Sequence, residues 1–267
     1  MLGAIIGDIV GGGFALHPTH SCKITLENGT FVFTENTVLM TAVCDLLYYC
    51  REPAKGRIER MIRSREITDM LKKYARAYPE KLPPAMRKWS ARRLREHSLA
   101  QADFSPIFAL GCAYAFGNLD DVLSQTELFC SDICDTESAR QCARAVNSAV
   151  YALKNGAEKE ALPDYVVSIE LNLDFQEVSE ELAFGRTPEA AVRAGFEAFL
   201  RSSDYDSALR YAVAYGAMSP TVAAVSGALA GEYYGVPDEL KELTYDTLGV
   251  LLRNPLDRFM ELYKDKR

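Results

Sequence analysis

Three short segments carry the polar residues whose types and spacing could do chemistry. In the first, Gly7-Asp8-Ile9-Val10-Gly11-Gly12-Gly13, a single acid stands among glycines inside an apolar run. Glycine inside a helix costs about 1 kcal/mol relative to alanine. Four glycines so close together therefore indicate either the close approach of another backbone or the broken end of a helix. Asp8 is the side chain of this segment that could bind a cation or transfer a proton.

The second segment places four polar side chains at the start of a strongly amphipathic helix, and these are Thr34, Glu35, Asn36 and Thr37. Thr34 or Asn36 could cap that helix, because a side-chain oxygen at this position accepts hydrogen bonds from the free N–H groups of the first turn. The third segment is Ala217-Met218-Ser219-Pro220-Thr221. A helix of mostly small residues, 222–231, follows it. Because small side chains let helices approach closely, we expect this helix to lie near the centre of the fold.

Helical periodicity dominates the elements that would position these segments. From Glu35 to Arg51, apolar residues recur with the i, i+3, i+4 spacing of a helix that buries one face. The run from Met1 to Ala15 is interpreted as a buried first helix, since Asp8 and the lack of a positively charged start argue against a signal peptide. Comparable patterns cover 67–78, 106–116, 136–155, 163–171, 188–200, 205–215, 221–234 and 244–263. The sequence thus predicts an all-α orthogonal bundle.

At most one pair of strands is expected. Lys23–Leu26 and Thr30–Thr34 flank Asn28-Gly29, a dipeptide typical of a tight hairpin turn. Because helical patterns account for most of the remaining chain, we expect this hairpin to be small and peripheral.

The composition fits a folded globular protein, with 48% hydrophobic and 25% charged residues in a chain of 267. No apolar stretch reaches about 18 residues, so no membrane span is expected. The chain has seven cysteines, an odd number, and no two of them have CxxC spacing. Because this pattern does not indicate a framework of disulfides, the chain is interpreted as cytoplasmic. The net charge of −7 argues against general nucleic-acid binding. The length favours one domain over residues 1–267.

Positive charge is concentrated in one part of the chain. Residues 51–96 contain 15 Lys or Arg against 6 Asp or Glu, an excess of +9 that leaves −16 for the rest. Such a segment is either a solvated helical face or a docking surface for an acidic partner or for phosphates.

Together, the three polar segments resemble the ADP-ribosylglycohydrolase family. That family opens with Gly-Asp-x-x-Gly, begins its second major helix with Thr-Asp-Asp-Thr, and has Gly-Asp-x-Asp-Thr before a small-residue helix ending in Tyr-Gly. In the same order this chain has Gly7–Gly11, Thr34-Glu35-Asn36-Thr37, Gly216–Thr221 and Tyr234-Gly235. Residues 1–50 and 188–267 match well, and the middle matches weakly. The resemblance implies a helical domain, two magnesium ions between the second and third motifs, and cleavage of the N- or O-glycosidic bond of ADP-ribose.

Several positions depart from the family's pattern. Glu35 and Asn36 stand at the two aspartates of the second motif, and Met218 and Pro220 stand at those of the third. A further acid of the family falls near Ala15. The family's central Gly-Asn-Gly loop has no counterpart in 100–104, and its Thr-His-x-His-Pro motif is absent because no histidine follows His97.

These departures remove most of the magnesium ligands. Magnesium prefers an octahedron of oxygens with carboxylates to compensate its charge. A methionine thioether is a soft ligand, and proline has no side-chain oxygen. The neutral hydroxyls of Thr34, Thr37 and Thr221 cannot replace three lost negative charges. The sequence therefore predicts no metal site and no cofactor.

Three hypotheses about function follow. The leading one is a member that binds ADP-ribose, a related nucleotide or a protein partner without catalysis, with a cleft formed by Asp8, Thr34, Glu35, Asn36, Thr37, Met218, Ser219, Pro220 and Thr221. The second is an active ADP-ribosyl hydrolase with a rebuilt site. Its candidate acids are Asp8, Glu35, Asp103 and Asp135, with His17 and His20 as possible bases. The third is a structural interaction protein that uses residues 51–96. Whether the chain is an enzyme stays open, and no catalytic residue is assigned.

Overall fold

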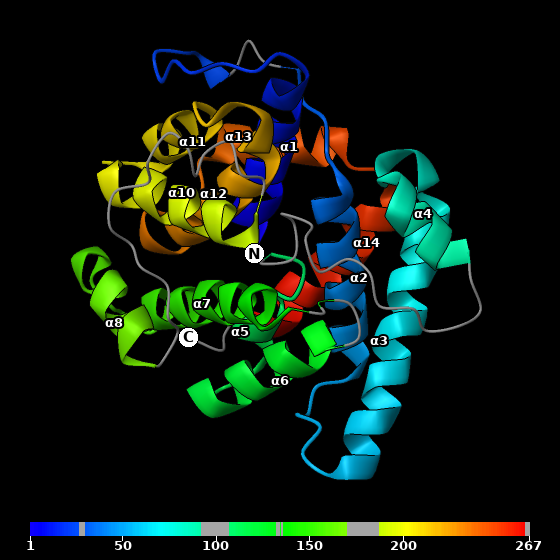
Figure 1. Cartoon of the computed structure of the whole chain (residues 1–267). Helices are drawn as coiled ribbons and strands as arrows, with labels where there is room; N and C mark the ends of the chain where they lie inside the picture. Colours follow the sequence, from blue (N-terminus) through cyan, green and yellow to red (C-terminus); the bar gives the residue numbers. More distant parts are fainter. Residues whose placement is uncertain (27–29, 92–106, 132–133, 135, 170–186, 265–267) are drawn as a thin grey trace.

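Every regular element in the described part of the chain is a helix (Figure 1). The structure is a computed structural model that describes residues 1–26, 30–91, 107–131, 134, 136–169 and 187–264. Its α-helices are α1 (Leu2–Leu16), α2 (Glu35–Tyr49), α3 (Arg57–Ala77), α4 (Pro84–Ala91), α5 (Cys112–Ala115), α6 (Leu119–Ser131), α7 (Glu137–Lys154), α8 (Leu162–Ser168), α10 (Pro188–Arg201), α11 (Tyr205–Val213), α12 (Ser219–Tyr233), α13 (Asp238–Thr247) and α14 (Val250–Tyr263). Short 3-10 helices are η2 (Pro79–Lys81), η3 (Lys159–Ala161) and η4 (Gly216–Met218). The all-α prediction is confirmed.

Helices α1 and α12 form the centre of the fold, in direct backbone contact. Gly3, Gly7 and Gly11 are four residues apart and therefore lie along one stripe of α1. A Cβ atom on any of the three would overlap a backbone carbonyl oxygen of α12, at Gly227, Ala223 and Ser219 in turn. The glycine cluster thus marks close backbone approach and not the broken end of a helix. The central place predicted for the small-residue helix is confirmed.

The other helices surround this pair in two groups. Figure 1 shows α10, α11 and α13 gathered around α1 and α12, whereas α3 and α4 lie beside α2 on the opposite side. Helix α14 packs against α2, and α7 connects α12 with α6. Helices α6 and α7 run across the direction of α2 and α3 in this view, as expected for an orthogonal bundle.

The predicted hairpin is not formed in the residues that the structure describes. Its turn, Asn28-Gly29, lies outside them, and neither flanking segment is a strand. The Val32 N–H instead donates to the Ile9 carbonyl of α1 at 3.2 Å. Gly12 allows this approach, because a Cβ atom there would overlap the Val32 carbonyl oxygen. A helix thus takes the hydrogen bond that a second strand would have used.

Several helix ends carry clear sequence signals, and one predicted helix is wrong. The Thr187 hydroxyl caps α10 by accepting from the Ala190 N–H at 3.2 Å, and Gly156 and Gly235 adopt the positive φ angles (86° and 82°) of helix C-termini. The helix expected over 244–263 is two helices, α13 and α14. Gly249 separates them in an extended conformation (φ −69°, ψ 161°), as suits a residue with poor helix propensity.

Cys44, Cys112 and Cys142 are buried in the core. No helix in the described ranges is both long and apolar enough to cross a membrane.

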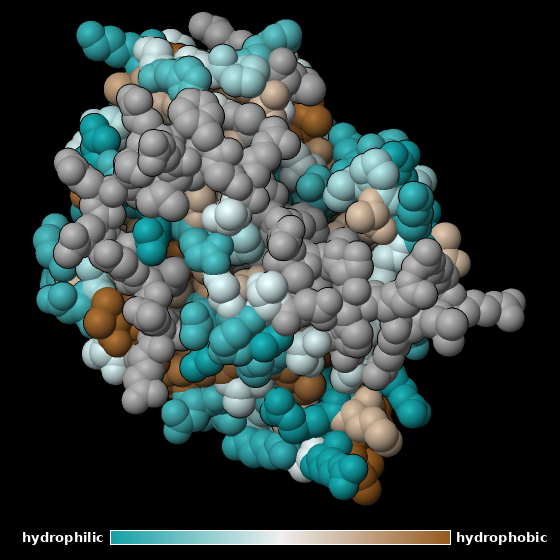
Figure 2. Space-filling view, viewed as in Figure 1, coloured by the Kyte–Doolittle hydropathy of each residue, from teal (hydrophilic) through white to brown (hydrophobic). Residues whose placement is uncertain are grey.

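The basic segment over 51–96 follows α3, η2 and α4 as far as residue 91, beyond which it lies outside the described residues. Part of its charge is compensated locally, since Lys55 pairs with Asp121 at 3.1 Å and Arg63 with Glu66 at 3.2 Å. Figure 2 shows hydrophilic side chains over much of the described surface on this side. Its use as a docking surface stays a prediction.

The backbone contact between α1 and α12 makes a stability prediction. Gly7→Ala should lower the free energy of unfolding by at least about 3 kcal/mol, because two backbones must separate to admit one methyl group. Gly117→Ala is the matched control, since a Cβ atom there meets nothing within 4 Å, and it should change stability by less than about 1 kcal/mol. Urea denaturation of both variants measures the difference. A Gly7→Ala variant as stable as the control would contradict the contact.

Candidate functional site

The buried carboxylate of Asp8 is the centre of the motif residues. Its oxygens accept hydrogen bonds from the Thr34 N–H at 2.9 Å and the Thr34 hydroxyl at 2.5 Å. They also accept from the Thr37 N–H at 3.2 Å, the Thr37 hydroxyl at 2.6 Å and Asn36 Nδ2 at 3.1 Å. All three donor residues lie at the start of α2. Asp8 of α1 therefore caps the N-terminus of α2, where a negative charge is stabilised by the helix dipole.

Two opposing effects act on the charge of Asp8. Desolvation by burial raises the pKa of its carboxyl group, while the hydrogen bonds from Thr34, Thr37 and Asn36 act to lower it. A carboxylate has about four lone-pair sites, and five donors already converge on this one. The donors that surround Asp8 therefore leave its oxygens little capacity for a further ligand.

Asn36 connects α2 to α12. Its Nδ2 donates both to Asp8 Oδ1 and to the Thr221 hydroxyl, each at 3.1 Å. Asn36 and Thr221 are both buried. The Asn36 Oδ1 atom is buried without a hydrogen-bond partner, which is unusual because nearly all buried polar atoms have one. An amide thus bridges the two helix starts between which the resemblance implies metal ions.

The third motif is held against α1. The Ser219 hydroxyl donates to the Gly11 carbonyl at 2.8 Å, and Met218 is buried. Gly216 has a positive φ of 73°, which bends the chain from α11 into η4. Pro220 lies in the first turn of α12, where its missing N–H would be unpaired in any case. The fold thus gathers the second and third motifs around α1, as the sequence predicted.

Only part of this cluster reaches the surface. Thr34, Glu35 and Pro220 are half-buried, whereas His17 and His20 are exposed. The His20 ring lies beside η4, since a Cβ atom on Gly216 would be 3.1 Å from its Cε1 atom. Asp103 and Asp135, the other candidate acids, lie outside the described residues. So does 100–104, the counterpart of the family's central loop.

Within the described residues, no group of three His, Cys, Asp or Glu side chains lies close enough together to hold a metal ion. Glu35 is half-buried in the first turn of α2, a position where the helix dipole stabilises an acid.

Comparison with known proteins places this fold and site in context. The sequence profile of the ADP-ribosylglycohydrolase family matches residues 1–266. The chain belongs to this family. A solved structure described as an ADP-ribosylglycohydrolase-related protein complex has a TM-score of 0.72 and 20% sequence identity, over 100% of this chain and 96% of that one. At this identity the likeness shows the fold alone. No curated protein matches the chain.

Family membership confirms the resemblance and leaves the chemistry of this member to be proposed. One local interpretation from sequence is also confirmed, since the Thr34 hydroxyl accepts from the Asn36 N–H at 3.2 Å and caps α2. The second cap, Asp8, was missed because it comes from another helix. The spacing of Thr34 and Thr37, both able to face one acceptor from the first turn, is the signal that could have indicated it.

The hydrogen bonds to Asp8 lead to a second stability prediction. Asp8→Ala should lower the free energy of unfolding by at least about 3 kcal/mol, because five donors lose their acceptor in a buried place. Asp206→Ala is the control, since Asp206 is exposed and pairs only with Arg210 in the contacts observed, and it should cost about 1 kcal/mol or less. Chemical denaturation at neutral pH compares them. Equal losses in the two variants would mean that Asp8 does not hold α2.

Proposed function

We propose that this member of the ADP-ribosylglycohydrolase family acts by binding ADP-ribose or a related nucleotide and not by metal-dependent hydrolysis. The observation that carries the proposal is the Asn36 bridge from Asp8 to Thr221. Its amide N–H groups occupy the space between α2 and α12 and direct positive partial charge there. The match over residues 1–266 supports the prediction of one domain over 1–267.

The residues present do not fit two magnesium ions. Four acids would be expected at Glu35, Asn36, Met218 and Pro220, and only Glu35 is one. The buried side chain of Met218 offers a thioether, which is a poor ligand for a hard cation. The Asp8 carboxylate, which is bonded to Asn36, has its oxygens taken by five donors. We therefore assign the protein no metal cofactor and derive no catalytic step through one.

The half-buried edge formed by Thr34, Glu35 and Pro220 supports a binding role. These residues lie where the buried network meets solvent, so a ligand could contact the starts of α2 and α12 without disrupting Asp8. Among the candidate acids within the described residues, a hydrolase with a rebuilt site would have to rely on Glu35, because Asp8 is buried and its oxygens already accept five hydrogen bonds. A purely structural role for the basic segment, residues 51–96, is supported by its positive charge alone.

Thermal unfolding with and without ligand tests the proposal. Saturating ADP-ribose in the presence of chelator should raise the Tm by about 3 °C or more, because a ligand at about 100 times its Kd stabilises the native state by roughly 2.7 kcal/mol. Millimolar magnesium without ADP-ribose should leave the Tm unchanged, since it lacks a site. Ribose serves as the control ligand. A rise of several degrees with magnesium alone would favour the hydrolase with a rebuilt site, and no response to ADP-ribose would contradict nucleotide binding.

An activity assay accompanies this measurement. We expect no release of ADP-ribose from modified arginine or serine peptides under conditions where an intact family member reacts. Should turnover occur, Glu35→Gln and Glu239→Gln would locate it, because both acids lie in the first turn of a helix and only Glu35 lies at the motif. Turnover abolished by Glu35→Gln alone would replace the binding proposal by the hydrolase one.

Restoring the family's acids tests whether these positions face a common site. The triple variant Asn36→Asp, Met218→Asp and Pro220→Asp should be destabilised in chelator, because like charges in a buried place repel one another. Magnesium or manganese should then recover the lost stability by neutralising the cluster. Pro220→Ala is the control for freeing the backbone, and Asn36→Asp alone is the milder variant if the triple one fails to fold. Variants whose stability does not change when magnesium or manganese is added would show that the three positions do not share a site.

A further inference from the structure

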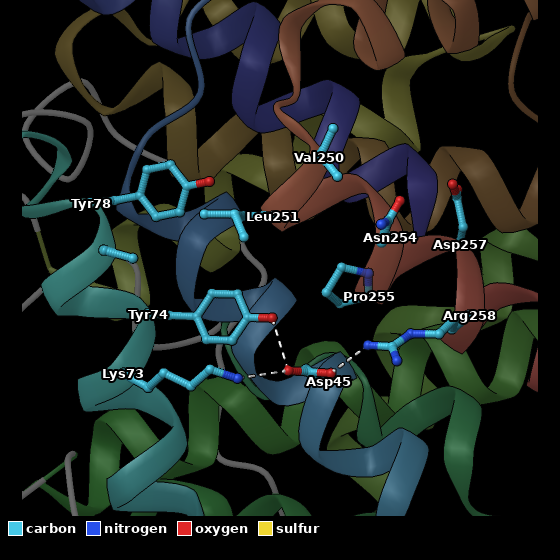
Figure 3. A pocket seen from close by; sticks show the side chains of 11 residues that line it. Asp45, Lys73, Tyr74, Tyr78, Val250, Leu251, Asn254, Pro255, Asp257 and Arg258 are labelled. Atoms are coloured by element: carbon cyan, nitrogen blue, oxygen red, sulfur yellow. Dashed lines mark hydrogen bonds and ion pairs between the residues drawn. The ribbon is translucent and has the colours of Figure 1, made fainter.

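A cavity lies between α2, α3 and α14, apart from the motif residues (Figure 3). Its volume is about 580 Å³, within the range of roughly 300–1,000 Å³ typical of small-molecule sites. Asp45, on its wall, follows Asn36 by nine residues on α2, which corresponds to about 13 Å along the helix. None of the residues that line the cavity belongs to the family motifs.

One end of the cavity is polar. Asp45 is buried there and accepts hydrogen bonds from Tyr74 at 3.0 Å, Lys73 at 3.4 Å and Arg258 at 3.0 Å (Figure 3). Burial and the charge of Asp45 raise the pKa of Tyr74, so its hydroxyl stays protonated and donates to Asp45. The Asp45 carboxylate is thus compensated by two cations and a hydroxyl from two other helices.

The opposite end is apolar. Val250 and Leu251 begin α14 and are 68% and 66% exposed, which is unusual for large aliphatic side chains next to a cavity. Pro255 and Tyr78 extend this surface, and Figure 3 shows Leu251 close to the Tyr78 ring. Pro255 has no N–H group, so the Leu251 carbonyl lacks its usual helical donor.

The charges around the cavity favour an anion. Among the lining residues, Lys73 and Arg258 face the carboxylate of Asp45, while Asp257 is paired at 3.8 Å with Arg253, which lies outside the lining. Together with Arg253, the surroundings of the cavity have an excess of one positive charge. Arg258 has five N–H donors, and its observed hydrogen bonds, to Asp45 and the Tyr49 hydroxyl, use two. Asp45 already accepts three hydrogen bonds, so its carboxylate has little capacity left for a cationic ligand. Lys73 and Arg258 would in addition repel such a ligand.

From this combination we infer that the cavity binds a small amphipathic carboxylate. Its aromatic or aliphatic body lies on Leu251, Pro255 and Tyr78, and its carboxylate accepts hydrogen bonds from Lys73 and Arg258. The inference concerns a different part of the molecule from the nucleotide-binding proposal and does not depend on it.

Matched probes of the same body test the charge. 2-Naphthoate, 2-naphthylmethanol and 2-naphthylmethylammonium differ in the group that they direct toward Lys73 and Arg258. Isothermal titration of the full-length protein should show saturable binding of 2-naphthoate at one site, about fivefold or more tighter than that of the neutral alcohol, since one additional charge contact contributes about 1 kcal/mol. Tighter binding of the ammonium compound than of 2-naphthoate, or no saturable binding of 2-naphthoate, would overturn the inference.

Two pairs of variants locate the site. Lys73→Gln and Leu251→Gln should each weaken 2-naphthoate binding by about fivefold or more, because each removes about 1 kcal/mol of charge or apolar contact. Lys55→Gln matches the first, since the Lys55 side chain is 69% exposed and ion-paired, against 66% for Lys73. Ile58→Gln matches the second, since Ile58 is 70% exposed. The controls should bind as the unmodified protein does, and equal weakening in a variant and its control would overturn the inference.

Discussion

The backbone contact between α1 and α12 is the constraint on which the rest of the structure depends. Gly3, Gly7 and Gly11 allow α1 to lie directly on the carbonyl oxygens of α12, at a distance that no residue with a Cβ atom would permit. Asp8 follows Gly7 by one residue, so its side chain leaves α1 at about 100° from the glycine stripe and points to α2. The contact between α1 and α12 therefore fixes the place of the third motif. It also fixes the direction of the Asp8 side chain, the single acid of the first motif.

Asp8 has a structural role, which is distinct from the metal binding that the family motifs imply. A buried carboxylate must be compensated, and here neutral donors from Thr34, Asn36 and Thr37 do so. Asp8 is thereby committed to holding α2 in place, independently of any metal ion. Changes at Met218 and Pro220 leave that task untouched, because neither residue is among the donors to Asp8, whereas Asn36 supplies one of the five. The fold can thus persist while the chemistry at the starts of α2 and α12 changes.

The sequence predicted well what depends on local pattern. The burial of α12 followed from its small residues, and the cap at Thr34 followed from the polar residues at the start of α2. Features that depend on partners distant in the chain could not be predicted in this way. The Val32 N–H bonds Ile9 instead of forming a hairpin, Asn36 meets Thr221 across 185 positions, and Asp45 meets Arg258 across 213. The break at Gly249 was missed because apolar periodicity continues on both sides of it.

The two buried carboxylates of α1 and α2 show how the kind of compensation decides what a site can offer. Five donors, all neutral, converge on Asp8, and they use its acceptor capacity while adding no net positive charge. Asp45 is instead compensated by Lys73 and Arg258, each of which has more donors than it directs to Asp45. In the first arrangement, the five donors leave the Asp8 oxygens little capacity for a further ligand. The second keeps donors of Lys73 and Arg258 at the wall of a cavity, and the inference that a small carboxylate binds there rests on these donors.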